Sequence, residues 1–227
     1  MRDVYVLLDD ADEKMRRVHE MYKESIRAEQ LGGPLQALIK NVLENWRSCL
    51  DYIADAVTQR DGKRGTKSYF PCSPNEIDFE KCFDQKMPGV RQKRSDLAIT
   101  FLRHQPFQPG HAWVEDLVTL TNENKHRQLT PQTREEIVEF MSGPGGGFIE
   151  QVGGARITMG ESALIRMGKG AKITFGGRGP VVAQNMKKTV LVDWLFADPR
   201  KSAIATLDAI QRGIRPTVED LLGAANL

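Results

Sequence analysis

Two short clusters of polar residues interrupt stretches of the sequence that otherwise have the pattern of apolar helices. The first cluster is Asn45-Trp-Arg47-Ser-Cys-Leu-Asp51-Tyr52. Arg47 and Asp51 are four residues apart, so on a helix they share one face and are expected to form an ion pair. Asn45 and Tyr52 lie closer to the apolar side of that helix, where they need buried hydrogen-bond partners.

The second cluster closes a later helical stretch and combines amides, cations and an imidazole. It reads Asn122-Glu-Asn124-Lys125-His126-Arg127. If the two helices pack side by side, both clusters converge on one place. The convergence would bring together amides, a carboxylate, several cations and a histidine.

Such a set of side chains could act on a phosphate group. Arg47, Lys125 or Arg127 would hold the phosphate, the arginines in a bidentate manner. His126 is the candidate acid and base because its ordinary pKa lies near neutrality. Together with Asp51 these parts suit a metal-independent cleavage of RNA, which needs a base for the ribose hydroxyl and a cation for the transition state.

A structural interpretation of the same residues competes with this one. Lys125, His126 and Arg127 in a last helical turn complement the helix dipole, and Arg47 with Asp51 forms a partly buried pair that stabilises the fold. From spacing alone this interpretation is the favoured one, because structural ion-pair networks imitate functional sites. An enzyme that uses the cluster on a small molecule is a third alternative.

The motifs, taken in order, resemble a widespread family of uncharacterised bacterial helical proteins. Its members carry an N-L-R-S-A-L-D-H-like segment, a Phe-Pro, a Leu-Gln-Pro and an N-x-x-K-H-R signature, which match the first cluster, residues 70–71, residues 105–106 and the second cluster. The resemblance covers residues 10–130. The positions that the resemblance implies are Asn45, Arg47, Asp51, Asn122, Lys125, His126 and Arg127. The polar clusters themselves add Tyr52 and Asn124 as further candidates for binding or orienting a phosphate.

More distantly, the helical region is similar to HEPN domains. HEPN nucleases place a histidine four to six residues after an arginine on one helix, usually across a dimer interface, whereas here Tyr52 stands five residues after Arg47. The resemblance implies RNA or a nucleotide as partner and a homodimer formed through the bundle. The departure at Tyr52 leaves His126, on another helix, as the candidate histidine.

The leading hypothesis is a HEPN-like protein that binds the phosphate of RNA or of a nucleotide, with metal-independent cleavage of RNA, as in toxin or defence ribonucleases, as its candidate activity. The alternative is a non-catalytic protein whose polar cluster is a buried network and which binds another protein through its β element or a face of the bundle.

The elements that must position these residues are mostly helices. Apolar residues at helical spacing predict helices over 10–30, 35–60, 75–85, 90–104, 111–127, 200–212 and 216–224. After residue 142 glycines alternate with short apolar runs, which predicts antiparallel strands over 148–152, 155–159, 163–167 and 171–175, joined by tight turns, and a further strand over 188–196. We therefore expect an α+β fold: a HEPN-like helical bundle over 1–140, a Gly-rich β element over 141–198, and C-terminal helices over 199–227 that pack back on the bundle.

The composition of the 227 residues excludes several classes of protein. The chain has 32 Lys and Arg residues and 30 Asp and Glu residues, so a protein that binds nucleic acid through a uniformly basic surface is excluded. No apolar run is long enough for a membrane span, and the run from Val4 to Leu8 is too short for a signal peptide. Three cysteines fit no zinc pattern, which predicts reduced thiols in a cytoplasmic protein with no metal and no cofactor.

Overall fold

The computed structural model of the chain describes residues 1–28, 30–126, 132–141, 148–151, 187–196 and 201–227. Contacts within it divide the chain into two compact units. The helical unit contains Met1–Gln132 and Phe196–Leu227, and the second unit contains Thr133–Leu195. The C-terminal segment therefore belongs to the same unit as the N-terminal helices.

Two long helices begin the helical unit, α1 (Arg2–Ala28) and α2 (Gly33–Asp61). The first starts eight residues earlier than the sequence predicts, because Val4 and Leu8 continue the buried stripe of Met15 and Val18. In α2 the stripe is almost wholly inaccessible to solvent; its largest members are Leu43, Trp46, Leu50 and Ile53. Burial of these stripes is the main favourable term in folding.

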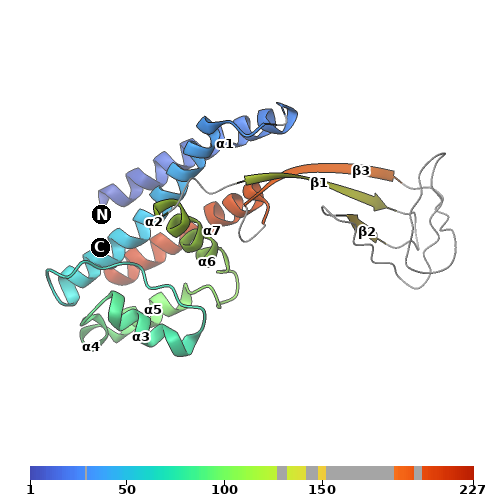
Figure 1. The fold of residues 1–227 in the computed structure, drawn as a ribbon. Coiled ribbons are helices and arrows are strands. Elements are labelled where there is room, and N and C mark those ends of the chain that lie inside the picture. Colours follow the sequence, from blue (N-terminus) through green and yellow to red (C-terminus); the bar gives the residue numbers. More distant parts are fainter. Residues whose placement is uncertain (29, 127–131, 142–147, 152–186, 197–200) are drawn as a thin grey trace, which may run out of the picture. The chain divides into compact units, whose positions relative to one another are not determined.

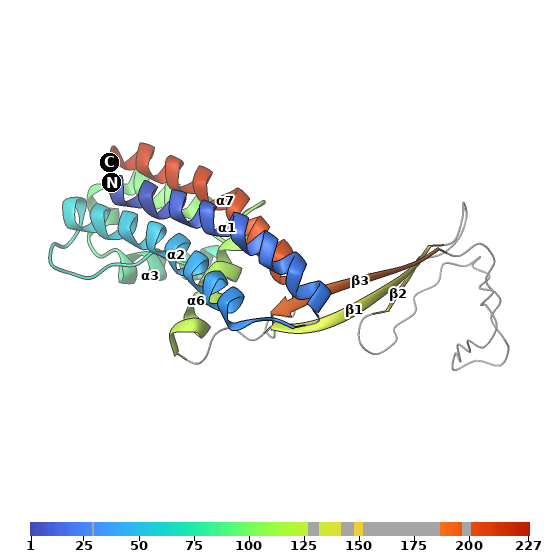
Figure 2. The same ribbon diagram turned by 90° about the horizontal axis from the view of Figure 1, so that it is seen from above.

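The last helix, α7 (Ala203–Ala225), packs against α1, α2, α5 and α6 (Figures 1 and 2). It is continuous where the sequence predicts two helices, although Pro216 removes one backbone hydrogen bond. Ile214 and Val218 on either side of the proline are buried, and this packing keeps the helix intact. Gly213 lets α7 approach α6 closely, since a Cβ there would lie 2.2 Å from Nε1 of Trp113.

Four shorter helices complete the unit: α3 (Glu76–Lys86), α4 (Val90–Lys93), α5 (Ser95–Arg103) and α6 (Trp113–His126). The predicted helix 90–104 is thus split at Arg94, whose backbone leaves the helical conformation with φ −139° and ψ 69°. The Arg94 side chain then bonds Asp96 at 2.7 Å and the carbonyl oxygen of Ala224 at 3.1 Å. The break gives α4 and α5 separate directions.

The second unit contains a three-stranded sheet in the order β2-β1-β3. Its strands are β1 (Gln132–Met141), β2 (Phe148–Gln151) and β3 (Lys187–Phe196). β1 and β2 are antiparallel, with Phe140 opposite Ile149. The predicted strands over 148–152 and 188–196 correspond to β2 and β3, whereas β1 lies in a stretch for which no strand is predicted. The other predicted strands, at 155–159, 163–167 and 171–175, lie outside the described residues.

The described helices confirm a mostly helical protein, consistent with a helical bundle. Within the parts of the chain that the structure describes, none of the helices has the length and apolar character needed to cross a membrane.

Candidate functional site

A row of polar side chains runs along one face of α2 and contains the first predicted cluster. Arg47, Asp51, Asp55 and Gln59 follow one another at intervals of four residues, so they stand above one another on the helix. The buried apolar stripe of α2 occupies the other side. This polar row faces the chain that returns after the helix ends.

The returning chain, residues 66–73, has no helix or strand, and we call it the docked segment. The polar row supplies its backbone with hydrogen-bond partners. Gln59 Nε2 donates to the carbonyl oxygen of Thr66 at 2.9 Å, and Asp55 Oδ1 accepts from the amide of Ser68 at 3.3 Å. Asp51 Oδ1 accepts from the amide of Phe70 at 2.9 Å. A buried backbone N–H or carbonyl group without a hydrogen-bond partner destabilises the folded state. These side chains supply the hydrogen bonds that a neighbouring strand would otherwise give to the docked segment.

Arg47 completes the row at the same residue of the docked segment. Its Nη2 donates to the carbonyl oxygen of Phe70 at 3.4 Å, and its Nε and Nη2 lie 3.2 and 3.1 Å from the two carboxylate oxygens of Asp51. The side chains of Arg47 and Asp51 are only 10% and 15% exposed. Nη1 of Arg47 is buried and has no hydrogen-bond partner among the described residues. The guanidinium is therefore directed into the fold.

The docked segment is held from its opposite side by Gln105, which follows α5. The Gln105 side chain donates to the carbonyl oxygens of Pro71 at 2.8 Å and Phe101 at 3.0 Å, and accepts from the amide of Ser73 at 3.0 Å. The residue is fully buried. The ring of Phe70 lies 5.7 Å from that of Phe101. Arg47, Asp51, the Phe-Pro and the Gln-Pro thus meet around a single stretch of backbone.

Asn45 and Tyr52 do not join Arg47 and Asp51. The Asn45 amide donates to Asp10 on α1 at 2.5 Å. Hydrogen bonds from Lys14 and then from Asn45 hold the pKa of Asp10 below its ordinary value, despite some burial. Tyr52 is 51% exposed. Asn45 and Tyr52 are seven residues apart, so they share one side of α2, away from Arg47. The expected burial of Tyr52 is therefore wrong.

The second predicted cluster is described in part. Asn122 lies on α6, a neighbour of α2, and is exposed. Asn124, Lys125 and His126 belong to α6, but their side chains lie outside the described part of the structure, as does the whole of Arg127. The predicted convergence of His126 with Arg47 and Asp51 stays a prediction.

Another polar cluster, centred on His104 at the end of α5, connects α5 to α7. The buried His104 places Nε2 2.8 Å from Oδ2 of Asp220, and Nδ1 3.1 Å from Nε2 of His111 and 3.3 Å from Oγ1 of Thr217. Burial lowers the pKa of His104, and the hydrogen bond that the ring makes to Asp220 opposes this shift only in part. Asp220 lies 116 residues from His104 in the chain, so no local spacing in the sequence could predict the contact between them.

The cysteine thiols are poorly suited to act as nucleophiles. All three cysteines are free thiols. Burial raises the pKa of Cys49 to about 12 and that of Cys72 to about 11, so both thiols stay protonated and are poor nucleophiles. Within the described ranges, no three His, Cys, Asp or Glu side chains are grouped so that they could hold a metal ion.

Arg91 on α4 and Arg94, which precedes α5, have acidic partners. Arg91 lies 3.1 Å from Glu80 and 2.9 Å from Asp84. Arg94 pairs with Asp96 and lies 3.7 Å from Asp61. Neither guanidinium is left free to bind a phosphate.

No protein-family model, no curated protein and no solved structure matches this chain. The functional argument therefore depends on the geometry of the described residues.

Proposed function

We propose that the helical unit is a non-catalytic protein-interaction module, in which the Arg47–Asp51 cluster is a structural network. The observation that supports this proposal is the double engagement of Phe70. Asp51 accepts from its amide, and Arg47 donates to its carbonyl oxygen. Both ends of the ion pair are therefore used on the backbone of the docked segment.

A phosphate-binding arginine needs N–H groups that a ligand can reach. In Arg47 the Nε and Nη2 groups have protein acceptors, and Nη1 is enclosed. A phosphate would have to displace Asp51 from the guanidinium and then compete with the carbonyl oxygen of Phe70. Breaking a buried ion pair in this way is strongly unfavourable.

Incubation with a fluorescent single-stranded RNA, without added metal, tests the proposal. We expect no cleavage by the wild-type chain. We also expect Arg47→Ala to lower the melting temperature, because it leaves Asp51 with an uncompensated, largely buried charge. Time-dependent cleavage that His126→Ala abolishes, with an unchanged melting temperature, would contradict the proposal and favour the metal-independent ribonuclease.

A conservative variant separates the two interpretations further. Asp51→Asn keeps an oxygen that can accept from the amide of Phe70, but it removes the charge that faces Arg47. Under the structural interpretation this variant is less stable than the wild type and more stable than Asp51→Ala. If all three chains unfold at the same temperature, Asp51 has no structural role and the proposal fails.

A further inference from the structure

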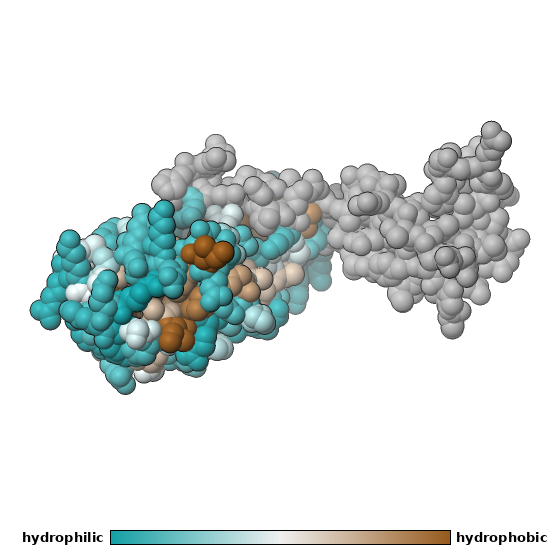
Figure 3. Space-filling view, turned by 90° about the horizontal axis from the view of Figure 1, so that it is seen from below, coloured by the Kyte–Doolittle hydropathy of each residue, from teal (hydrophilic) through white to brown (hydrophobic). Residues whose placement is uncertain are grey.

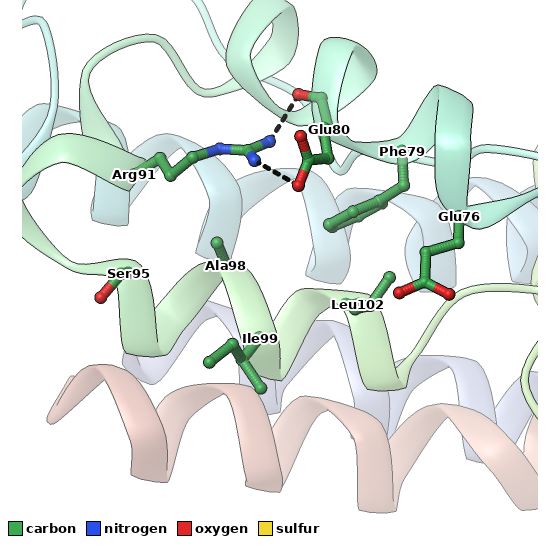
Figure 4. A pocket seen from close by; sticks show the side chains of 8 residues that line it. All are labelled: Glu76, Phe79, Glu80, Arg91, Ser95, Ala98, Ile99 and Leu102. Atoms are coloured by element: carbon green, nitrogen blue, oxygen red, sulfur yellow. Dashed lines mark hydrogen bonds and ion pairs between the residues drawn. The ribbon is translucent and has the colours of Figure 1, made fainter.

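An apolar groove opens between α3 and α5 (Figure 4). Phe79 and Ala98 are buried at its base, and Ile99 and Leu102 line it from α5. Its volume is about 220 Å³. Since small-molecule sites commonly measure roughly 300–1,000 Å³, this groove suits one or two apolar side chains better than a cofactor.

One large apolar side chain of the lining, Ile99, remains exposed. Ile99 is 61% exposed, and Ile77, on α3 but outside the lining, is 89% exposed. The space-filling view from below shows brown and tan side chains gathered within a mainly hydrophilic face (Figure 3). Ser95, Ile99 and Leu102 are four and three residues apart on α5, so they form one continuous helical face. Such a face matches the periodicity of a second helix laid against it.

The charges at the rim of the groove have one predominant sign. Of the residues that line the groove, Glu76 and Glu80 are acidic and Arg91 is basic. The cation of the lining, Arg91, is already bound by Glu80 and Asp84, and also donates to the carbonyl oxygen of Glu80 at 2.6 Å. Glu76, at the other end, has no ion-pair partner among the described residues. The rim is therefore acidic.

We propose that the α3–α5 groove binds a basic amphipathic helix of another protein. The inference rests on the proposed interaction function and names its surface and the chemistry of its partner. Apolar side chains of the partner helix fill the space over Phe79 and Ala98, and a lysine or arginine one turn away lies opposite Glu76. A second copy of this chain fits less well, because a symmetric contact would place two acidic rims against each other.

Fluorescence anisotropy of the full chain with a designed peptide tests this proposal. The probe is a labelled helix of about fourteen residues, made of Leu, Lys and Ala, with its leucines on one face. A second peptide carries Glu at every Lys position. We expect saturable binding of the Lys peptide and at least about tenfold weaker binding of the Glu peptide, since opposite charges at the rim favour only the former.

Three variants connect the binding to the groove. Ile99→Ala should weaken binding of the Lys peptide about fivefold to tenfold, because it removes apolar contact area. Glu76→Lys should weaken it about twofold to fivefold and should improve binding of the Glu peptide. Ile77→Ala is the matched control, since it removes an exposed isoleucine of α3 that does not line the groove, and it should leave both affinities unchanged.

Several results would overturn the proposal. These are absence of Lys-peptide binding, equal affinity for both peptides, and affinities that neither Ile99→Ala nor Glu76→Lys changes. A wild-type dimer that Ile99→Ala converts to a monomer would also overturn it and assign the groove to a second copy. The peptide assay is independent of the RNA assay, so failure here leaves the structural role of Arg47 to be judged by its own experiment.

Discussion

The docked segment and the α3–α5 groove show opposite uses of side chains in one helical unit. At the docked segment, charged and amide side chains point inward and are bound to backbone groups. At the groove, isoleucine and leucine side chains remain at the surface, and acids surround them. The charged and amide side chains, which are the ones suited to catalysis, therefore stabilise the fold, whereas the surface that a partner can reach is apolar.

The largest effect in this comparison is expected from Arg47→Ala. The variant leaves the Asp51 carboxylate without its partner and the carbonyl oxygen of Phe70 without a donor. We predict a loss of about 3–5 kcal/mol in the free energy of unfolding, measured by urea denaturation. Arg215→Ala, which removes exposed pairs with Asp9 and Asp12, is the control and should lose less than half as much. If both variants lost the same free energy of unfolding, the buried Arg47–Asp51 pair would stabilise the protein no more than the exposed pairs of Arg215.

Gln105→Glu probes the other side of the docked segment with almost no change in shape. The new carboxylate oxygen would face the carbonyl oxygens of Pro71 and Phe101, to which the amide now donates. We expect a loss of about 2–3 kcal/mol at neutral pH, because a buried acceptor would replace a donor. The loss should shrink at low pH, where a protonated carboxyl can donate again. A variant as stable as the wild type would show that Gln105 does not hold the segment.

Gly213→Ala provides a packing defect in the same unit without loss of a polar contact. A Cβ at this position would overlap the Trp113 ring, so we predict a destabilisation of about 1–3 kcal/mol. Gly223→Ala is the matched control, because its Cβ meets nothing within 4 Å and alanine favours a helix. That change should stabilise the protein by about 0.5 kcal/mol. Equal changes in the free energy of unfolding for the two alanine variants would contradict the close packing of Gly213 against Trp113.

His104 tests a polar contact whose charge depends on pH. Its pKa in the folded chain lies below its ordinary value of 6.5, so the unfolded chain takes up the proton more readily. The free energy of unfolding should therefore fall as the pH drops below about 6.5, and His104→Gln should reduce this fall. His111, Asp220 and Arg103 are the charged or titratable neighbours of the ring. Identical pH profiles for the variant and the wild type would contradict the prediction.

Much of the helical unit was predictable because apolar stripes at helical spacing persist over many turns. The spacing of Arg47 and Asp51 correctly indicated their ion pair. The same four-residue interval continues through Asp55 and Gln59, so the sequence pattern also indicates the rest of the polar row. By contrast, the contacts of Asp51 with Phe70 and of His104 with Asp220 depend on how the chain folds back, which local spacing does not encode. The strand β1 was missed because charged residues interrupt its alternation.

The most direct test of the central claim is the amide hydrogen exchange of Phe70. Its N–H belongs to no helix or strand, and Asp51 Oδ1 is its acceptor at 2.9 Å. The account predicts that this amide is protected in the wild type and loses most of its protection in Asp51→Ala, under conditions where the α2 amides remain protected. A Phe70 amide that exchanges in the wild type as fast as in an unstructured peptide would contradict the account.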